Sequence, residues 1–195
     1  MPKLVGVRER RHQPFYDTLI RVMASTAPTP TLTQTTKLFA AGTNMSNTEW
    51  TNMAATGQLP SDQTFVILAM RCFLWFRGTN AMLCYTLCVH QLYLQLFVGD
   101  KPIFLSPCWM FPQGGGIWGY DSSTPMMCNG EPTQQAILKF AKAIPIPARQ
   151  HFYVEATFYD TSTLSLRTNY LNSSSSIGDR EIKVLIDGIN TRDVQ

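Results

Sequence analysis

Apolar and polar residues alternate most regularly between residues 152 and 159, in the last third of the chain. One side of this segment carries Phe152, Val154, Ala156 and Phe158, and the other carries Tyr153, Glu155, Thr157 and Tyr159. A period of two residues is typical of a strand that buries one face. The preceding residues, Ile144-Pro145-Ile146-Pro147, hold two prolines, which cannot donate to a sheet ladder and lie at an edge or between strands. The pattern therefore predicts a sheet that turns a corner at 144–147.

Other apolar runs predict further strands, at residues 15–23, 37–41, 64–76, 90–98, 103–106 and 181–189. The run at 64–76, TFVILAMRCFLWF, is apolar on both faces, which predicts a central strand buried on both sides or one that crosses an interface. Gly99-Asp100-Lys101 separates two of the runs and predicts a hairpin. Residues 81–89 are apolar without alternation and fit either a strand or a helical turn.

One short helix is predicted over residues 47–55. Ser46-Asn47-Thr48-Glu49 fits a capping box, in which Ser46 accepts from the Glu49 amide while Glu49 reaches back. Gly57 closes the helix, and Trp50 and Met53 face inward together. The helix is expected to pack on a sheet edge.

The segment from Cys108 to Tyr120 is irregular, with three consecutive glycines between Trp109 and Trp118. A phosphate-binding loop would need a lysine or a helix N-terminus directly after the glycines, and neither follows here. The composition predicts a long loop that packs against the sheet or against a neighbouring molecule.

The composition narrows the class of protein. The chain has 195 residues, which is enough for one domain with its own core. Charged residues make up 15% of the chain, against about 25% in ordinary soluble proteins. Low charge removes the repulsion that keeps monomers apart, so part of the surface is expected to be covered by other chains.

The net charge of +3 is too small to indicate a nucleic-acid-binding protein by itself. Its distribution is uneven, because Lys3, Arg8, Arg10 and Arg11 stand against Glu9 alone among the first eleven residues. This segment fits a solvated terminus, or a basic arm that contacts phosphates or a neighbouring subunit. Composition leaves both interpretations open.

No arrangement of residues indicates catalysis, a metal or a cofactor. The five cysteines are odd in number, form no CxxC pair and lie mostly among apolar residues, which predicts reduced core residues. His12, His90 and His151 form no HxH or HxxE pattern, and no GxSxG motif occurs. The N-terminus is polar as far as Tyr16, and no apolar run without interruption reaches the roughly 18 residues of a membrane span. We therefore expect neither an enzyme nor a secretory signal.

Aromatic residues suggest two kinds of binding. Tyrosine and tryptophan side chains can stack on sugar rings, as in a carbohydrate-binding or receptor-binding jelly roll, and they also anchor protein interfaces. The low charge along the whole chain favours the interpretation as a protein interface over that as a sugar-binding site. The residues concerned are Trp109, Trp118, Tyr120, Tyr153 and Tyr159.

Four blocks of sequence carry a resemblance to a known family. They are GQLP at Gly57–Pro60 running on to Phe65, LFVGDKPIFLSP at Leu96–Pro107, FPQGGGIWG at Phe111–Gly119 and IPIPARQHFYVE at Ile144–Glu155. Together with the few charges, the Thr/Pro-rich N-terminal segment and the closing strand, they resemble the single jelly-roll capsid proteins of tailless icosahedral bacterial viruses. The likeness covers roughly residues 43–159.

The resemblance implies an all-β fold, an eight-stranded jelly-roll β-sandwich with one short helix and long inserted loops. Residues 1–30 would form an N-terminal arm and extended segment, and residues 31–195 the jelly-roll domain. The implied function is that of a capsid protein, made in the host cytoplasm, which self-assembles with many copies of itself into an icosahedral shell that encloses the genome. Other capsid proteins are implied as partners in the virion.

The resemblance also implies which residues make contacts. The loop from Phe111 to Pro132 would be the largest inter-subunit loop. The N-terminal arm would contact the genome or, in a virion with an internal membrane, lipid headgroups, although it is less basic than arms that condense single-stranded genomes. The implied interface residues are Trp109, Phe111, Gly114, Gly115, Gly116, Trp118 and Tyr120, and the implied arm residues are Lys3, Arg8, Arg10 and Arg11.

Overall fold

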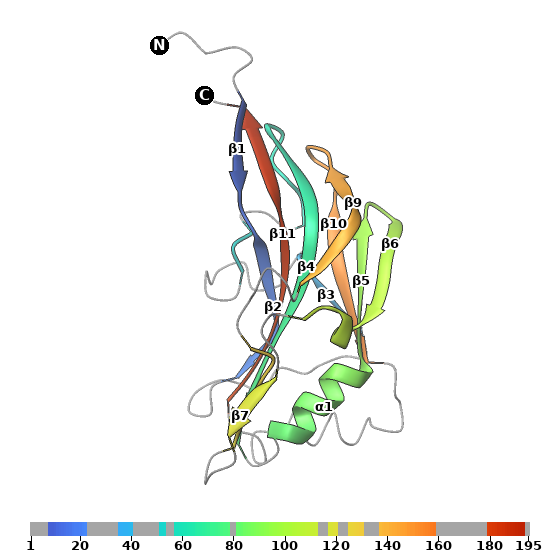
Figure 1. Cartoon of the computed structure of the whole chain (residues 1–195). Coiled ribbons are helices and arrows are strands. Elements are labelled where there is room, and N and C mark those ends of the chain that lie inside the picture. Colours follow the sequence, from blue (N-terminus) through green and yellow to red (C-terminus); the bar gives the residue numbers. More distant parts are fainter. Residues whose placement is uncertain are drawn as a thin grey trace.

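The computed structural model consists mostly of β-strands, arranged as two antiparallel sheets with one α-helix at one end (Figure 1). It describes residues 8–22, 35–40, 51–53, 57–78, 81–112, 117–120, 125–130, 137–158 and 179–193. The two sheets face each other, and the residues between them form the core.

The larger sheet has seven strands and is built on two long ones, β4 (Gln63–Arg77) and β11 (Arg180–Asp193), which pair along nearly their whole length. The other edge of β11 pairs with two strands in succession, and so does the other edge of β4. The flanking strands are β1 (Arg8–His12) and β2 (Phe15–Val22) on β11, β9 (Leu138–Ile146) and β8 (Met126–Cys128) on β4, and β7 (Trp118–Tyr120) beyond β8.

The smaller sheet has four strands in the order β3 (Thr35–Leu38), β10 (Phe152–Phe158), β5 (Leu92–Val98) and β6 (Lys101–Pro107). The turn between β5 and β6 contains Gly99 at φ 62, a conformation that glycine adopts without strain. This pair confirms the predicted hairpin. At one end of the sandwich lie the helix α1 (Ala81–Gln91) and the 3-10 helix η1 (Cys108–Met110) (Figure 1).

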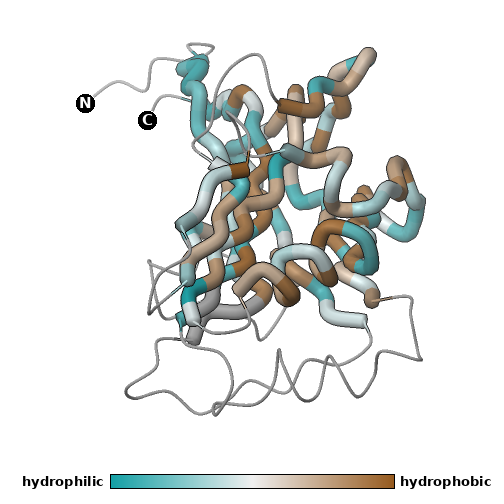
Figure 2. Tube along the Cα trace, turned by 60° about the horizontal axis from the view of Figure 1, so that its bottom comes forward, coloured by the Kyte–Doolittle hydropathy of each residue, from teal (hydrophilic) through white to brown (hydrophobic). Residues whose placement is uncertain are grey.

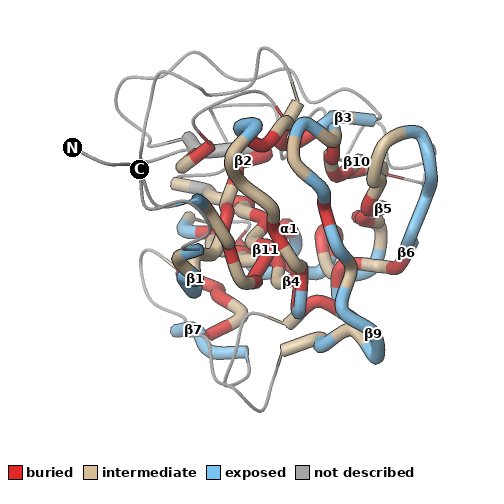
Figure 3. The backbone as a smooth tube through the Cα atoms, turned by 90° about the horizontal axis from the view of Figure 1, so that it is seen from above, coloured by how far each residue is buried: buried red, intermediate tan, exposed pale blue. Residues whose placement is uncertain are grey.

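Strands with alternating sequences supply the core. Phe152, Val154, Ala156 and Phe158 of β10 are buried, as predicted, and so are Ile182, Val184 and Ile186 of β11. Figure 3 shows that buried positions occur on the strands of both sheets. Removing a large side chain of this kind from water stabilises the fold by about 1.5–3 kcal/mol. Hydrophobic burial therefore holds the two layers together.

The larger sheet curls because its pairing slips at Leu68. Ile67 of β4 pairs with Gly188 of β11, but Ala69 pairs with Asp187, so Leu68 is an extra residue in its strand. A bulge of this kind bends the strand and increases its twist. It also changes which residues of β4 face inward, from Phe65 and Ile67 before the bulge to alternate residues from Met70 onward.

Gly188 allows the close pairing at this bend. A Cβ atom built on Gly188 would lie 2.2 Å from the Val66 carbonyl oxygen and 2.6 Å from the Phe65 ring. We expect Gly188→Ala to lower the free energy of unfolding by about 3 kcal/mol, the upper end of the cost of overpacking. Urea denaturation measures this, with the half-buried neighbour Ile189→Ala as the control. A Gly188→Ala protein as stable as the parent would contradict the close packing of Gly188 against Val66 and Phe65.

The corner prediction is confirmed. Pro145 and Ile146 pair with β4 on one edge of β9, and the next strand along the chain, β10, belongs to the smaller sheet. The prolines therefore lie where the chain leaves one sheet for the other.

The helix predicted over residues 47–55 is wrong at residues 51–53, the part of it that the structure describes. Residues 51–53 are not helical, and Thr51 forms a β-bridge with Asp17. Residues 47–50 and 54–55 lie outside the described part of the chain. The Thr51 hydroxyl donates to the Tyr16 carbonyl (3.0 Å), and the Tyr16 amide donates to Asn52 Oδ1 (2.9 Å). Side chains of this type compete with helical hydrogen bonds, and here they tie the segment to β2.

The α-helix lies instead at Ala81–Gln91, and the strand predicted from His90 begins at Leu92. The buried positions of α1 follow helical spacing, at Ala81, Cys84, Tyr85 and Cys88. The sequence of α1, AMLCYTLCVHQ, has too few polar residues on the side facing away from the core, so the helical period is not visible in it.

β4 is a central strand, as predicted, but only one of its faces is buried throughout. Its outward residues are mostly half-buried, and Leu68 is 39% exposed. Arg71 and Asp187 form an ion pair on this outer face, with side chains that are 14% and 9% exposed. β3 begins two residues earlier than predicted, at Thr35.

Candidate functional site

Exposed apolar side chains gather at the end of the sandwich that carries α1. Six of the nine large apolar residues that are exposed in the described chain lie there, Leu83 of α1 among them, which marks this end as unusual. Five of the six line two neighbouring hollows, and we call these five the aromatic patch: Met82 of α1, Trp109 of η1, Ile117, Trp118 and Tyr120. Figure 2 turns this end forward and shows that the chain near the two termini, by contrast, is hydrophilic.

The patch is continuous. A hollow of about 560 Å³ is lined by Met82, Ile117, Trp118 and Tyr120, and a second hollow of about 190 Å³ is lined by Ile117 and Trp109. Ile117 borders both hollows and joins the two tryptophans into one surface. Contiguous apolar surface of this kind marks a site of contact with another molecule.

Backbone pairing holds the rings of the patch in place. Trp118 pairs with Cys128 and Tyr120 with Met126, so β7 is fixed on β8, and β8 is fixed on β4. A Cβ atom on Gly119 would lie 2.3 Å from the Met126 carbonyl oxygen, so only glycine fits between the two rings. The patch is therefore a preformed surface.

The residues expected at the interface divide into three groups. Trp109, Trp118 and Tyr120 are 57%, 51% and 47% exposed and belong to the patch. Phe111 instead belongs to the core, because it is fully buried and its ring packs edge-on against Phe104 at 5.6 Å. Gly114, Gly115 and Gly116 lie outside the described residues. Sequence reasoning missed Met82 and Ile117, whose exposure depends on how α1 and β7 meet.

The basic N-terminal segment is partly built into the larger sheet. Arg8, Arg10 and Arg11 lie in β1, which pairs with β11, and Lys3 lies outside the described residues. Arg8 forms an ion pair with Asp193 (3.2 Å). Arg10 is exposed and has no ion pair among the described residues, so it is the arginine of β1 best placed to meet an anionic partner.

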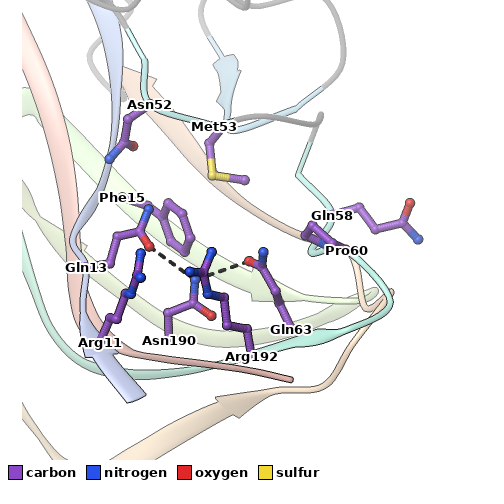
Figure 4. A pocket seen from close by; sticks show the side chains of 10 residues that line it. All are labelled: Arg11, Gln13, Phe15, Asn52, Met53, Gln58, Pro60, Gln63, Asn190 and Arg192. Carbon is purple, nitrogen blue, oxygen red and sulfur yellow. Dashed lines mark hydrogen bonds between the residues drawn. The ribbon is translucent and has the colours of Figure 1, made fainter. Parts of the chain in front are cut away.

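A polar pocket lies at the opposite end of the sandwich, where β4 begins and β11 ends (Figure 4). Its volume is about 210 Å³. We call it the amide pocket, because five of its ten lining residues carry side-chain amides: Gln13, Asn52, Gln58, Gln63 and Asn190. The other five are Arg11, Phe15, Met53, Pro60 and Arg192.

The cysteines are buried thiols without disulfide bonds. A hydrogen bond with Cys108 and burial raise the pKa of Cys72, and burial raises the pKa of Cys88. Burial also raises the pKa of Tyr85 in α1 to about 12. These groups stay protonated at neutral pH, which makes the thiols poor nucleophiles.

The histidines do not come together. His12 lies in β1, His90 in α1 and His151 beside the start of β10, and all three are exposed. Within the residues that the structure covers, no group of three or more His, Cys, Asp and Glu side chains is placed to hold a metal ion. Nor does any helix in that part of the chain have the length and apolar character needed to cross a membrane.

Comparison with known proteins finds no protein-family model and no curated protein that matches this chain.

Proposed function

We propose that this chain is a capsid protein with an eight-stranded jelly-roll fold, which self-assembles into the icosahedral shell of a virion. The observation that carries the proposal is the nesting of its strand pairs. β2 pairs with β11, β3 with β10, β4 with β9, and β5 with β6.

Nested pairs arise when one long antiparallel hairpin of four strand pairs is wound into two facing sheets. The larger sheet then contains β2, β11, β4 and β9 in that order, and the smaller sheet contains β3, β10, β5 and β6. We interpret this order as that of a jelly roll, an architecture common in viral capsid and lectin domains. Fold alone does not establish function, so the proposal also depends on the properties of the surface.

The aromatic patch supports self-association. Trp118 and Tyr120 are of the types that dominate protein interfaces, and they project from a backbone that is fixed before binding. A patch at one end of the subunit would meet a different surface of the next copy, and such contacts close into a shell when the rotation between subunits permits. Many weak contacts of this kind, with other copies and other capsid proteins, stabilise a particle through avidity.

The exposed edge strands β6 and β9 carry residues that oppose strand pairing between subunits, which leaves the ends of the sandwich for subunit contact. β6 and β9 are largely exposed (Figure 3). They carry the residues that block edge-to-edge pairing, namely Lys101, Pro102, Lys139, Lys142 and Pro145. Lysines and prolines at both edges disfavour growth by strand addition, so we assign subunit contact to the aromatic patch. Contact with the genome or with anionic lipid is assigned to Arg10 and to the residues that precede β1.

Expression of the full chain tests the proposal. We expect the purified protein to form large symmetric particles or defined oligomers, visible by electron microscopy and light scattering, because the aromatic patch is exposed on the single subunit. A 22 kDa monomer at high concentration, across a range of salt and pH, would overturn the proposal.

The second candidate function is recognition of a carbohydrate, as in a receptor-binding module. The amide pocket favours it, because amides, arginines and a phenyl ring line one small hollow.

A further inference from the structure

We infer that the amide pocket binds a single acidic sugar unit, a ring-sized polyol that carries one carboxylate. This inference is independent of shell assembly, because the pocket and the aromatic patch lie at opposite ends of β4 and β11.

Strand register places the polar groups on one face. Glu9 of β1 pairs with Arg192 of β11, which pairs with Gln63 of β4. One step closer to the core, Arg11 pairs with Asn190, which pairs with Phe65. Asn190 and Arg192 continue the inward phase of Ile182, Val184 and Ile186, so the inner face of β11 turns from apolar to polar beyond Gly188.

The two arginines of the pocket share one carboxylate. Glu9 accepts from Arg11 Nε at 2.6 Å and from Arg192 Nε at 2.8 Å. Two guanidinium groups against one carboxylate leave a surplus of one positive charge, and their terminal N–H groups have no partner among the described residues. Planar N–H donors with net positive charge suit a second carboxylate.

Asn190 supplies a buried acceptor that lacks a donor. The residue is 5% exposed, and its side-chain nitrogen donates to Gln13 Oε1 and Gln63 Oε1, both at 3.2 Å (Figure 4). Its Oδ1 atom has no hydrogen-bond partner among the described residues. A buried acceptor left in this state is costly. The atom itself is closed off from the pocket, so a ligand hydroxyl would reach it only if the Asn190 side chain turned. The Gln13 and Gln63 amide nitrogens add donors beside it.

The side-chain amides of Asn52 and Gln58 bond to the backbone of the protein itself and are not available to a ligand. Asn52 donates to the Pro14 carbonyl (2.7 Å) and accepts from the Tyr16 amide, and Gln58 points away from the hollow to donate to the Arg149 carbonyl (2.7 Å) (Figure 4). These bonds leave Asn190, Gln13 and Gln63 as the amides that face a ligand.

Phe15 and Met53 give the pocket an apolar side. Phe15 is 5% exposed, and its ring is held edge-on by Phe65 at 4.7 Å. Aromatic rings pack well against the C–H face of a sugar, while the amides and arginines address its hydroxyl and carboxylate groups. A volume of about 210 Å³ lies below the roughly 300–1,000 Å³ of pockets for larger ligands, so one ring is the size that fits.

Titration of the full chain with glucuronate, followed by NMR or calorimetry, tests the inference. We expect saturable binding in the roughly millimolar range usual for ligands this small. Glucose, acetate and sulfate serve as comparison ligands. Each should bind at least about tenfold more weakly, because it lacks either the carboxylate or the ring.

Variants locate the site. Arg192→Gln should weaken glucuronate binding by about tenfold or more, since one charge-assisted contact is lost. Glu9→Gln should strengthen it, because the carboxylate that competes with the ligand is removed. Lys142→Gln, the same loss of charge on β9, should leave binding unchanged. Thermal unfolding shows whether each variant is folded, and Arg192 and Arg11 are 41% and 51% exposed, so their replacement is tolerated.

The inference is overturned if the folded parent protein fails to bind glucuronate. It is also overturned if Arg192→Gln and Arg11→Gln leave affinity unchanged, or if acetate or sulfate binds as well as glucuronate. Particle formation, scored separately by electron microscopy, distinguishes any of these results from failure of the capsid proposal.

Discussion

Replacing Trp118 with alanine is expected to abolish particle formation while leaving the subunit folded. Trp118 is 51% exposed, and it lines the larger hollow of the aromatic patch beside Ile117 and Tyr120. Truncating an anchoring interface tryptophan costs about 2–4 kcal/mol per contact, and in the proposed shell the loss would repeat at every copy. Removing an exposed side chain changes subunit stability by about 0.5 kcal/mol or less.

Leu105→Ala is the matched control for Trp118→Ala. Leu105 is 49% exposed, close to the 51% of Trp118, but it lies in β6 of the smaller sheet and outside the patch. Electron microscopy gives the particle yield and thermal unfolding gives the stability. Normal yield with Trp118→Ala, or a loss of yield that merely follows a loss of thermal stability, would show that the patch does not drive assembly.

The second large effect is expected at Asp187. Removing its carboxylate leaves Arg71 as a charge on a largely buried site without its partner. Breaking one half of a buried pair costs about 3–5 kcal/mol, so Asp187→Ala should shift the urea midpoint strongly downward. Asp193→Ala removes a carboxylate from the same strand, but its pair with Arg8 is 60–68% exposed and contributes at most about 1 kcal/mol.

A double replacement separates charge from packing at this pair. Arg71→Met combined with Asp187→Leu removes both charges and keeps apolar volume on the outer face. Such replacements are often neutral, so the double variant should recover most of the stability that Asp187→Ala loses. If Asp187→Ala were no more damaging than Asp193→Ala, the pair would behave as an ordinary surface contact and the expectation would fail.

Local patterns in the sequence predict the strands well where one face is buried. β10 and β11 alternate cleanly, Gly99 marks the hairpin, and Pro145 and Pro147 mark the change of sheet. α1 was not predicted because residues 81–98 form one largely apolar segment that contains both the helix and β5, and only contacts with the core separate the two elements. The capping box at Ser46 predicted a helix from local bonds, but Thr51 and Asn52 bond to β2, a partner distant in the chain.

The candidate sites are harder to predict from the sequence than the strands are, because they depend more on contacts between residues that are distant in the chain. Trp109 and Phe111 are two apart in an irregular segment, where spacing does not tell which ring is exposed, and only one of them is. Asn190 and Arg192 are in phase with the apolar residues of β11, which is a local signal for inward polar groups. Their meeting with Gln13 and Gln63 requires the register of three strands, which local sequence does not contain.

β11 is the last strand of the described chain, and the larger sheet depends on it, since it pairs with β1, β2 and β4. A nascent chain on the ribosome therefore holds the apolar strand β4 without its main partner until β11 has been synthesised. Pairing of Arg8 with Asp193 joins the two ends of the described chain, and contacts between such remote residues form slowly. A growing chain with exposed strands is prone to aggregate, so it would benefit from chaperones.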